Sequence, residues 1–160
     1  MRLMRSLAAM IGATLACGSA LALAIAVPLP ERVAKADFIG VVEIRSVWRT
    51  AVPEPGEMDV APEGYLQNAD GYVLEVIKGE RVPSHVVINF DTGFVCPNVL
   101  DERGAVYLVF LREDPDGGYS TVGYTQGRFK VRDDLIDYWG RQDVVTLSNA
   151  KQDIQRLMAR

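Results

Sequence analysis

One short segment, AVYLVFL at residues 105–111, restricts the fold more than any other part of the chain. It holds only apolar and aromatic side chains and carries no charge. A run of this length and composition is typical of a strand that is covered on both faces. We therefore expect this segment at the centre of a β-sheet.

Alternating patterns predict further strands around this segment. Strands are predicted at residues 37–49, 72–77, 84–90, 119–124 and 127–131, and the alternation of faces is clearest at 37–49 and 84–90. The second and third of these predict a hairpin. In the first, one face of a long strand is expected to be buried, and it carries Phe38, Gly40, Val42, Ile44 and Trp48. Residues 50–71 hold three prolines, three glycines and five carboxylates, which predicts a long, mobile connection.

The C-terminal residues change to a helical period. A stripe of apolar side chains predicts a helix at about residues 147–158, with Thr146 or Ser148 as its N-cap. Five or six strands with one C-terminal helix are typical of a mainly β protein with a small, closed or nearly closed barrel. We expect the barrel at residues 37–132 and a C-terminal extension at residues 133–160.

The N-terminal residues predict a targeting segment. Arg2 and Arg5 precede an uninterrupted run of apolar or small residues at 7–27, and small residues spaced as A-x-A occur at 22–24, 24–26 and 34–36. The run is also long enough to span a bilayer. We therefore expect residues 1–26 to be either a cleaved signal peptide or an uncleaved membrane anchor, and residues 27–36 to be a linker.

Cys17 adds a third alternative for this segment. It follows Leu15 and Ala16 and precedes Gly18, as in a lipoprotein cleavage box, although Thr14 stands where a large aliphatic residue is usual. In each case the chain is expected to be exported, to the periplasm or beyond, or held at the membrane.

The charge of the chain argues against a nucleic-acid partner. The formal net charge is −4, and a positive groove would be needed to bind phosphates. Aromatic side chains are present, but we expect them to form barrel core instead of base-stacking platforms: Tyr72, Phe90, Phe94 and Tyr107.

Several segments, in their order, resemble the bacterial netrin-like domains. They are ADFIGVVEI, YVLEVIKGE, a cysteine after the third strand, GAVYLVFLRE and GGYSTVGYTQGRFKV. That family shares an OB-like five-stranded barrel with the tissue inhibitors of metalloproteinases. The resemblance implies a five- to six-stranded OB-like barrel in an extracytoplasmic setting. It does not imply inhibition, because those inhibitors bind zinc through an N-terminal cysteine, which only the lipoprotein form at Cys17 would have here.

Residue types that support metal or catalytic chemistry are sparse. His85 is the single histidine, no zinc-ligand spacing is present, and we expect its ring on the solvent face of a strand. Asp114 and Asp116 resemble the start of a calcium loop, but the distal glutamate is missing, so we expect a hairpin turn. No serine lies in a G-x-S-x-G elbow. We predict no catalytic residue, no metal site and no cofactor.

Cys96, in NFDTGFVCPNV, is the only cysteine that a form without residues 1–26 keeps. The resemblance implies a disulfide partner near the following hairpin, where this chain has Val122, Gly123 and Tyr124 instead. Three states of Cys96 remain open: a buried small residue, one half of an intermolecular disulfide, or a reactive thiol.

Two functional hypotheses follow. The first is an exported, non-enzymatic β-barrel domain that binds an envelope or extracellular protein, or a small ligand, through a barrel face or the acidic loop at residues 50–71. The second is an envelope structural protein that self-associates, as a homodimer linked through Cys96 or through an N-terminal anchor at residues 7–27. An enzyme is the least supported class.

Overall fold

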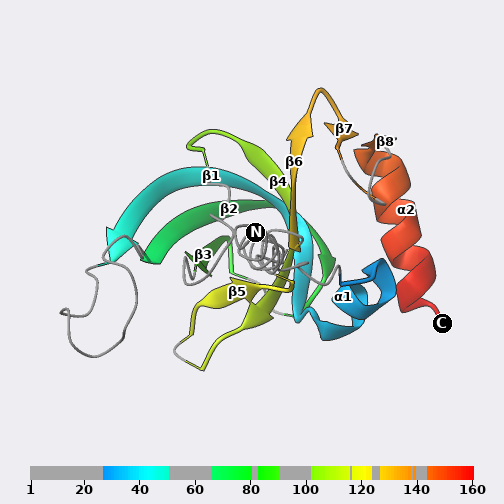
Figure 1. Ribbon diagram of the computed structural model, residues 1–160, viewed down its shortest axis with the longest axis horizontal. Coiled ribbons are helices and arrows are strands. Elements are labelled where there is room, and N and C mark those ends of the chain that lie inside the picture. The colour runs from blue at the N-terminus through cyan, green and yellow to red at the C-terminus, as the bar shows by residue number, and fades with distance from the viewer. Residues whose placement is uncertain are drawn as a thin grey trace, which may run out of the picture.

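The computed structural model describes residues 27–50, 66–80, 83–90, 102–115, 117–123, 127–137, 139 and 144–160. Their elements, in chain order, are α1 (Leu29–Lys35), β1 (Phe38–Thr50), β2 (Leu66–Lys78), β3 (His85–Phe90), β4 (Val106–Glu113), β5 (Tyr119–Thr121), β6 (Arg128–Arg132), β7 (Leu135–Ile136), β8 (Val145–Thr146) and α2 (Leu147–Met158). Figure 1 shows the strands curving around one another, with α2 beside them.

Five strands close into a barrel. β1 pairs antiparallel with β2, β2 antiparallel with β3, β3 parallel with β5, and β5 antiparallel with β4. The pairing of β4 with β1 closes the ring. Since β1 takes one edge of β4, β5 and β6 share the other edge, and β7 and β8 extend the sheet from β6. The expected mainly β fold with a small barrel and one C-terminal helix is confirmed.

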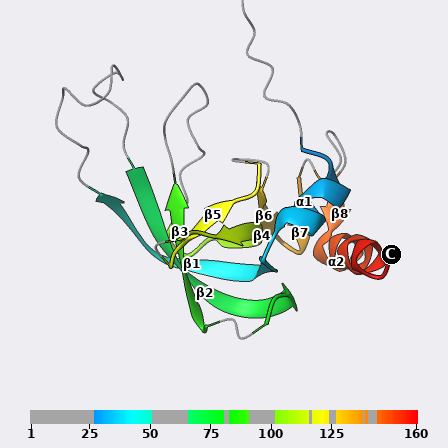
Figure 2. The ribbon, with the colours of Figure 1, turned by 90° about the horizontal axis from the view of Figure 1, so that it is seen from below.

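Two apolar cores lie on opposite sides of the barrel wall. The interior core contains Phe38, Val42, Ile44, Ala69, Val86, Ile88, Tyr107, Val109 and Leu111. The outer core contains Ile39, Val41, Leu108, Phe110, Phe129 and Ile136 from the strands, Trp139, and Val33, Ala36, Ala150 and Ile154 from α1, α2 and their caps. Figure 2 shows α1 and α2 together at one end of the barrel.

β4 contributes to both cores, as the uncharged run at residues 105–111 predicts. Tyr107, Val109 and Leu111 face the interior core, while Leu108 and Phe110 face the outer core. All five side chains are buried. A strand between two apolar layers cannot alternate apolar and polar side chains, which explains its continuous apolar sequence.

β2 is longer than its sequence pattern predicts. We expected a connection as far as residue 71, but β2 begins at Leu66, and its first residues pair with both β1 and β3. Buried and more exposed residues do alternate here. The buried ones are the small residues Ala69 and Gly71, so the sequence shows no stripe of large apolar side chains. Tyr72 was expected in the core and is exposed instead.

The expected linker at residues 27–36 contains α1. A helix of seven residues has little stability alone, so packing has to hold it in place. Val33 and Ala36 are buried in the outer core, and α1 contacts α2 and β4. A segment this short carries no helical period that could be read from the sequence.

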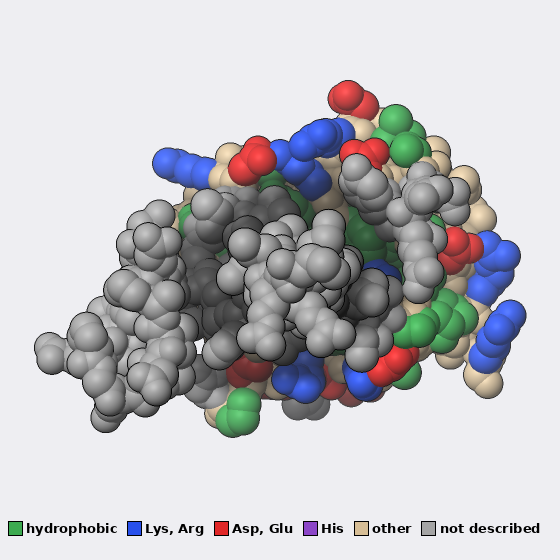
Figure 3. Space-filling view, viewed as in Figure 1, with side chains coloured by type: hydrophobic (Ala, Val, Ile, Leu, Met, Phe, Trp, Pro, Cys, Tyr) green, Lys and Arg blue, Asp and Glu red, His purple; other side chains and the backbone are tan. Residues whose placement is uncertain are grey.

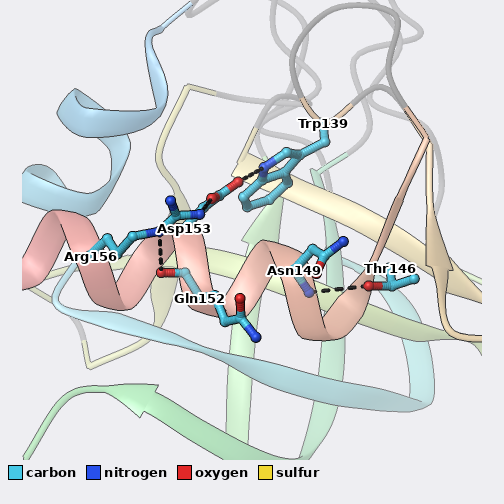
Figure 4. Close-up of polar contacts among 6 residues, drawn as sticks. All are labelled: Trp139, Thr146, Asn149, Gln152, Asp153 and Arg156. Carbon is cyan, nitrogen blue, oxygen red and sulfur yellow. Dashed lines mark hydrogen bonds and ion pairs between the residues drawn. The ribbon is translucent and has the colours of Figure 1, made fainter.

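α2 has the bounds that its apolar stripe predicts. Thr146 is its N-cap, and the Oγ1 atom of Thr146 accepts a hydrogen bond from the backbone N–H of Asn149 at 3.2 Å (Figure 4). Trp139 ties the preceding segment to the helix, because its indole Nε1 donates to Asp153 Oδ2 at 3.1 Å. Asp153 also forms an ion pair with Arg156. Two residues that precede α2 in the chain therefore bond to it: Thr146 at its N-terminus and Trp139 at its middle.

Candidate functional site

The exposed apolar side chains concentrate on three strands. Among the described residues, eight large hydrophobic side chains are exposed, and five of them lie on β1, β2 and β3: Trp48, Tyr72, Leu74, Val76 and Val87. The helices cover a different part of the barrel wall. We name as the open face the outward-pointing residues Glu43, Arg45, Trp48, Asn68, Asp70, Tyr72, His85 and Val87.

Strand register places these residues side by side. On β2, Tyr72 lies opposite Glu43 of β1 and His85 of β3. Gly71 is next to Tyr72 in the chain and Val86 is next to His85, and both face the interior. Because successive residues of a strand face opposite sides of the sheet, Tyr72 and His85 must face outward. The open face therefore crosses three strands without interruption.

Tyr72 is at the centre of a small network. The Arg45 guanidinium lies 5.1 Å from the centroid of the Tyr72 ring, and Arg45 also pairs with Glu43 at 2.9 Å. The His85 ring contacts Tyr72 edge-on, with 5.2 Å between centroids. His85 Nδ1 lies 3.0 Å from Asp70 Oδ1. These contacts favour the observed orientation of the Tyr72 ring at the surface, where a cation–π contact contributes about 0.5–1 kcal/mol.

Trp48 supplies a second aromatic group on the open face. It is 40% exposed and pairs across the strands with Asn68. Asn68 and Tyr72 are four residues apart on β2, so the two aromatic side chains are about 13 Å apart along the strand. Val87, opposite Asp70 on β3, adds an exposed aliphatic side chain between them. The open face thus combines two separated aromatic rings with polar groups that flank them.

The position of Trp48 corrects a prediction from the alternating pattern. We expected Trp48 on the buried face with Phe38 and Ile44, but it is exposed. The register of β1 against β2 shifts between Ile44 and Ser46, which leaves Arg45 as an extra residue. A bulge of one residue reverses the faces of everything after it. Val47 consequently packs against the interior core, and Trp48 points outward.

The charges around the described part of the molecule are mixed. Figure 3 shows acidic and basic side chains interspersed on the face that it draws. On the open face, Arg45 forms an ion pair with Glu43, and His85 contacts the carboxylate of Asp70. Mixed charges of this kind do not produce a strong field of one sign over the face that Figure 3 draws.

His85 lies on the solvent face of its strand, as predicted, with its side chain 51% exposed. Asp114, named above as a calcium-loop candidate, braces the turn between β4 and β5. Its carboxylate accepts hydrogen bonds from Ser120 Oγ at 2.6 Å and from Asn89 Nδ2 at 3.1 Å. Gly117 closes the turn with a φ of 88°, a conformation that favours glycine. No group of three or more His, Cys, Asp or Glu side chains in the described residues could hold a metal ion.

Other predicted site residues lie outside the described residues. They are Cys17, Phe94, Cys96, Asp116 and the apolar run at residues 7–26. The three states of Cys96 and the alternatives for the N-terminal segment therefore stay predictions. In the helices that the structure does describe, none has the length and apolar character needed to cross a membrane.

No family model matches the chain, and no curated protein matches it either.

Proposed function

We propose that this chain is an exported, non-enzymatic binding module, and that the open face binds a protein of the cell envelope or its surroundings. One observation carries the proposal: Arg45, Trp48 and Tyr72 are together on one exposed face. Tryptophan, tyrosine and arginine are the residue types enriched at the energetic centres of protein interfaces. No other exposed face of the described residues combines the three.

The strand order supports the OB-like part of the proposal. The order β1-β2-β3-β5-β4, closed by β1 with β4 and with β3 parallel to β5, suits a five-stranded Greek-key barrel. The resemblance to bacterial netrin-like domains is part of the same proposal. Export rests on the basic and apolar pattern of residues 1–26.

Preorganisation of the open face supports a binding role. Binding has a cost in ordering side chains at an interface, about 0.5–1.5 kcal/mol for each flexible one. Arg45 is already held by Glu43 and by the Tyr72 ring, and His85 by Asp70. A partner that contacts these groups would therefore meet side chains that have lost part of their freedom.

The experiment places a photo-crosslinking amino acid at Trp48, at Tyr72 or at Leu135 in the full chain, expressed in its native host. Leu135 is the matched control, since it is 44% exposed and lies on β7, away from the open face. We expect the same partner to be captured from Trp48 and from Tyr72, and not from Leu135. Equal capture from all three positions, or none from the open face, would refute the proposal.

A second measurement uses the captured partner in purified form. We expect Trp48→Ala to weaken its binding at least about tenfold, which corresponds to 1.4 kcal/mol, whereas Leu135→Ala leaves binding unchanged. An adduct with twice the mass of the chain would instead support the self-association hypothesis. The partner would then be a second copy of this protein.

A further inference from the structure

The residues that directly follow the predicted targeting segment are part of the folded domain. Ala36 is only 2% exposed, and Val33 and the partly buried Leu29 pack in the outer core with residues of α2 and the barrel. At the end of α1, the backbone N–H of Asp37 donates to Leu111 O at 2.8 Å, and Asp37 Oδ2 accepts from the backbone N–H of Glu113 at 2.9 Å. The residue that follows the cap of α1 is thus hydrogen-bonded to β4, and α1 itself packs against β4 and α2.

A lysine of β2 fastens the C-terminal end of α1. Lys78 Nζ donates to Val33 O at 2.7 Å and to Ala36 O at 2.6 Å. The last carbonyl groups of a helix have no partner within the helix, and a cation is favourable at this end of the helix dipole. Lys78 therefore satisfies groups that exist only while α1 is present.

An arginine fixes the chain just before α1. Arg32 is buried, its Nε donates to Val27 O at 2.7 Å, and its guanidinium lies 5.3 Å from the centroid of the Phe129 ring. Burial lowers the pKa of Arg32 from its ordinary value. The contact with Val27 carries the ordered chain one residue beyond the helix cap at Pro28. The contacts of the folded domain therefore extend along the chain as far as Val27.

We propose that the signal peptidase cleaves before Val27, after Ala24 or after Ala26, and that α1 stays in the mature protein. The A-x-A spacing at residues 34–36 is a site that the fold argues against, because its use would remove α1. The inference rests on the export half of the proposed function. In the reaction, water adds across one peptide bond, leaving a carboxylate on Ala24 or Ala26 and an amino group on Ile25 or Val27.

The first experiment determines the N-terminal residue of the protein taken from the envelope fraction of its native host, by intact mass and N-terminal sequencing. We expect Ile25 or Val27. A first residue of Asp37 would overturn the inference while leaving export intact. A chain that keeps Met1 in the membrane fraction would also overturn it. A chain found only in the cytoplasm would refute export itself, which is the separate, proposed function.

Substitutions at the A-x-A sites provide a matched pair. Replacing both Ala24 and Ala26 by Arg removes the two proposed sites, and we expect the uncleaved chain to accumulate. Ala34→Arg removes the third site at an exposed position of α1, and we expect the same mature N-terminus as in the native chain. If the double variant were cleaved after Ala36 into a stable product, α1 would be dispensable and the inference wrong.

The role of α1 in the fold has its own test in the mature protein. Val33→Asp places a charge in the outer core, whereas Ala34→Asp places the same charge on the exposed side of the same helix. We expect Val33→Asp to lower Tm by at least about 8 °C and Ala34→Asp by less than about 2 °C. Lys78→Met should lower Tm more than Lys130→Met, because the ion-pair partner of Lys130 is the exposed Glu102. Equal shifts within these pairs would show that α1 is not held as described.

Discussion

Replacing Ile154 by alanine tests whether α2 is a structural part of the barrel wall. Ile154 is fully buried in the outer core, on the face of α2 that meets the strands. The substitution removes three carbon atoms, worth about 0.8 kcal/mol each, and leaves a cavity that raises the cost. Buried isoleucine-to-alanine changes cost about 2–5 kcal/mol. We expect a loss of about 3 kcal/mol in the free energy of unfolding.

Urea denaturation followed by tryptophan fluorescence measures this loss. A Trp48→Phe background leaves Trp139 as the reporter, and Trp139 belongs to the same core as Ile154. With a slope of about 2 kcal/mol per molar urea, the midpoint should fall by about 1.5 M. The control is Gln155→Ala, at an exposed position of the same helix, with an expected change within about 0.5 kcal/mol. A loss below about 1 kcal/mol for Ile154→Ala would refute the packing of α2 on the barrel.

Three other outcomes follow from particular contacts. Gly40→Ala should lower Tm more than Gly71→Ala, because the new Cβ would lie 2.4 Å from a Phe38 ring atom in the first and 3.3 Å from its nearest neighbour in the second. Thr146→Ala should destabilise the protein by about 1 kcal/mol in thermal unfolding through the lost N-cap, and Thr146→Ser should not. The hydrogen bond and charge of Lys130 lower the pKa of Glu102, so in an NMR titration Lys130→Met should raise it. Because the folded pKa is the lower one, this contribution is present at neutral pH and is lost as the pH falls through that pKa.

The parts of the fold that the sequence predicted are those where burial requires apolar side chains. β4 and α2 show this best, since a strand between two cores must be apolar throughout and a helix on a barrel must carry a stripe. β2 shows the limit. Its first half is held by backbone pairing with β1 and β3, and its buried side chains are small, so hydrophobicity alone could not reveal it.

The open face was harder to predict than the fold. The prediction that Trp48 is buried requires the alternation of β1 to continue through Arg45, where the register shifts instead. A bulge depends on how two strands pair, and no pattern in one strand reports it. An aromatic residue in a strand is predicted to be in the core, yet the cross-strand neighbours of Tyr72 are the charged or polar residues Glu43 and His85. The identity of these cross-strand neighbours follows only from the strand register.

The division of β1 between two environments connects the fold to the proposed function. Over residues 38–42 the strand has the interior core on one side and the outer core, with the helices, on the other. Val41 is the last residue of β1 that packs in the outer core with the helices. The bulge at Arg45 follows soon after it. Without the bulge, Trp48 would face the interior position that the smaller Val47 now fills. The irregularity that completes the interior core is therefore the same one that brings an indole ring to the open face.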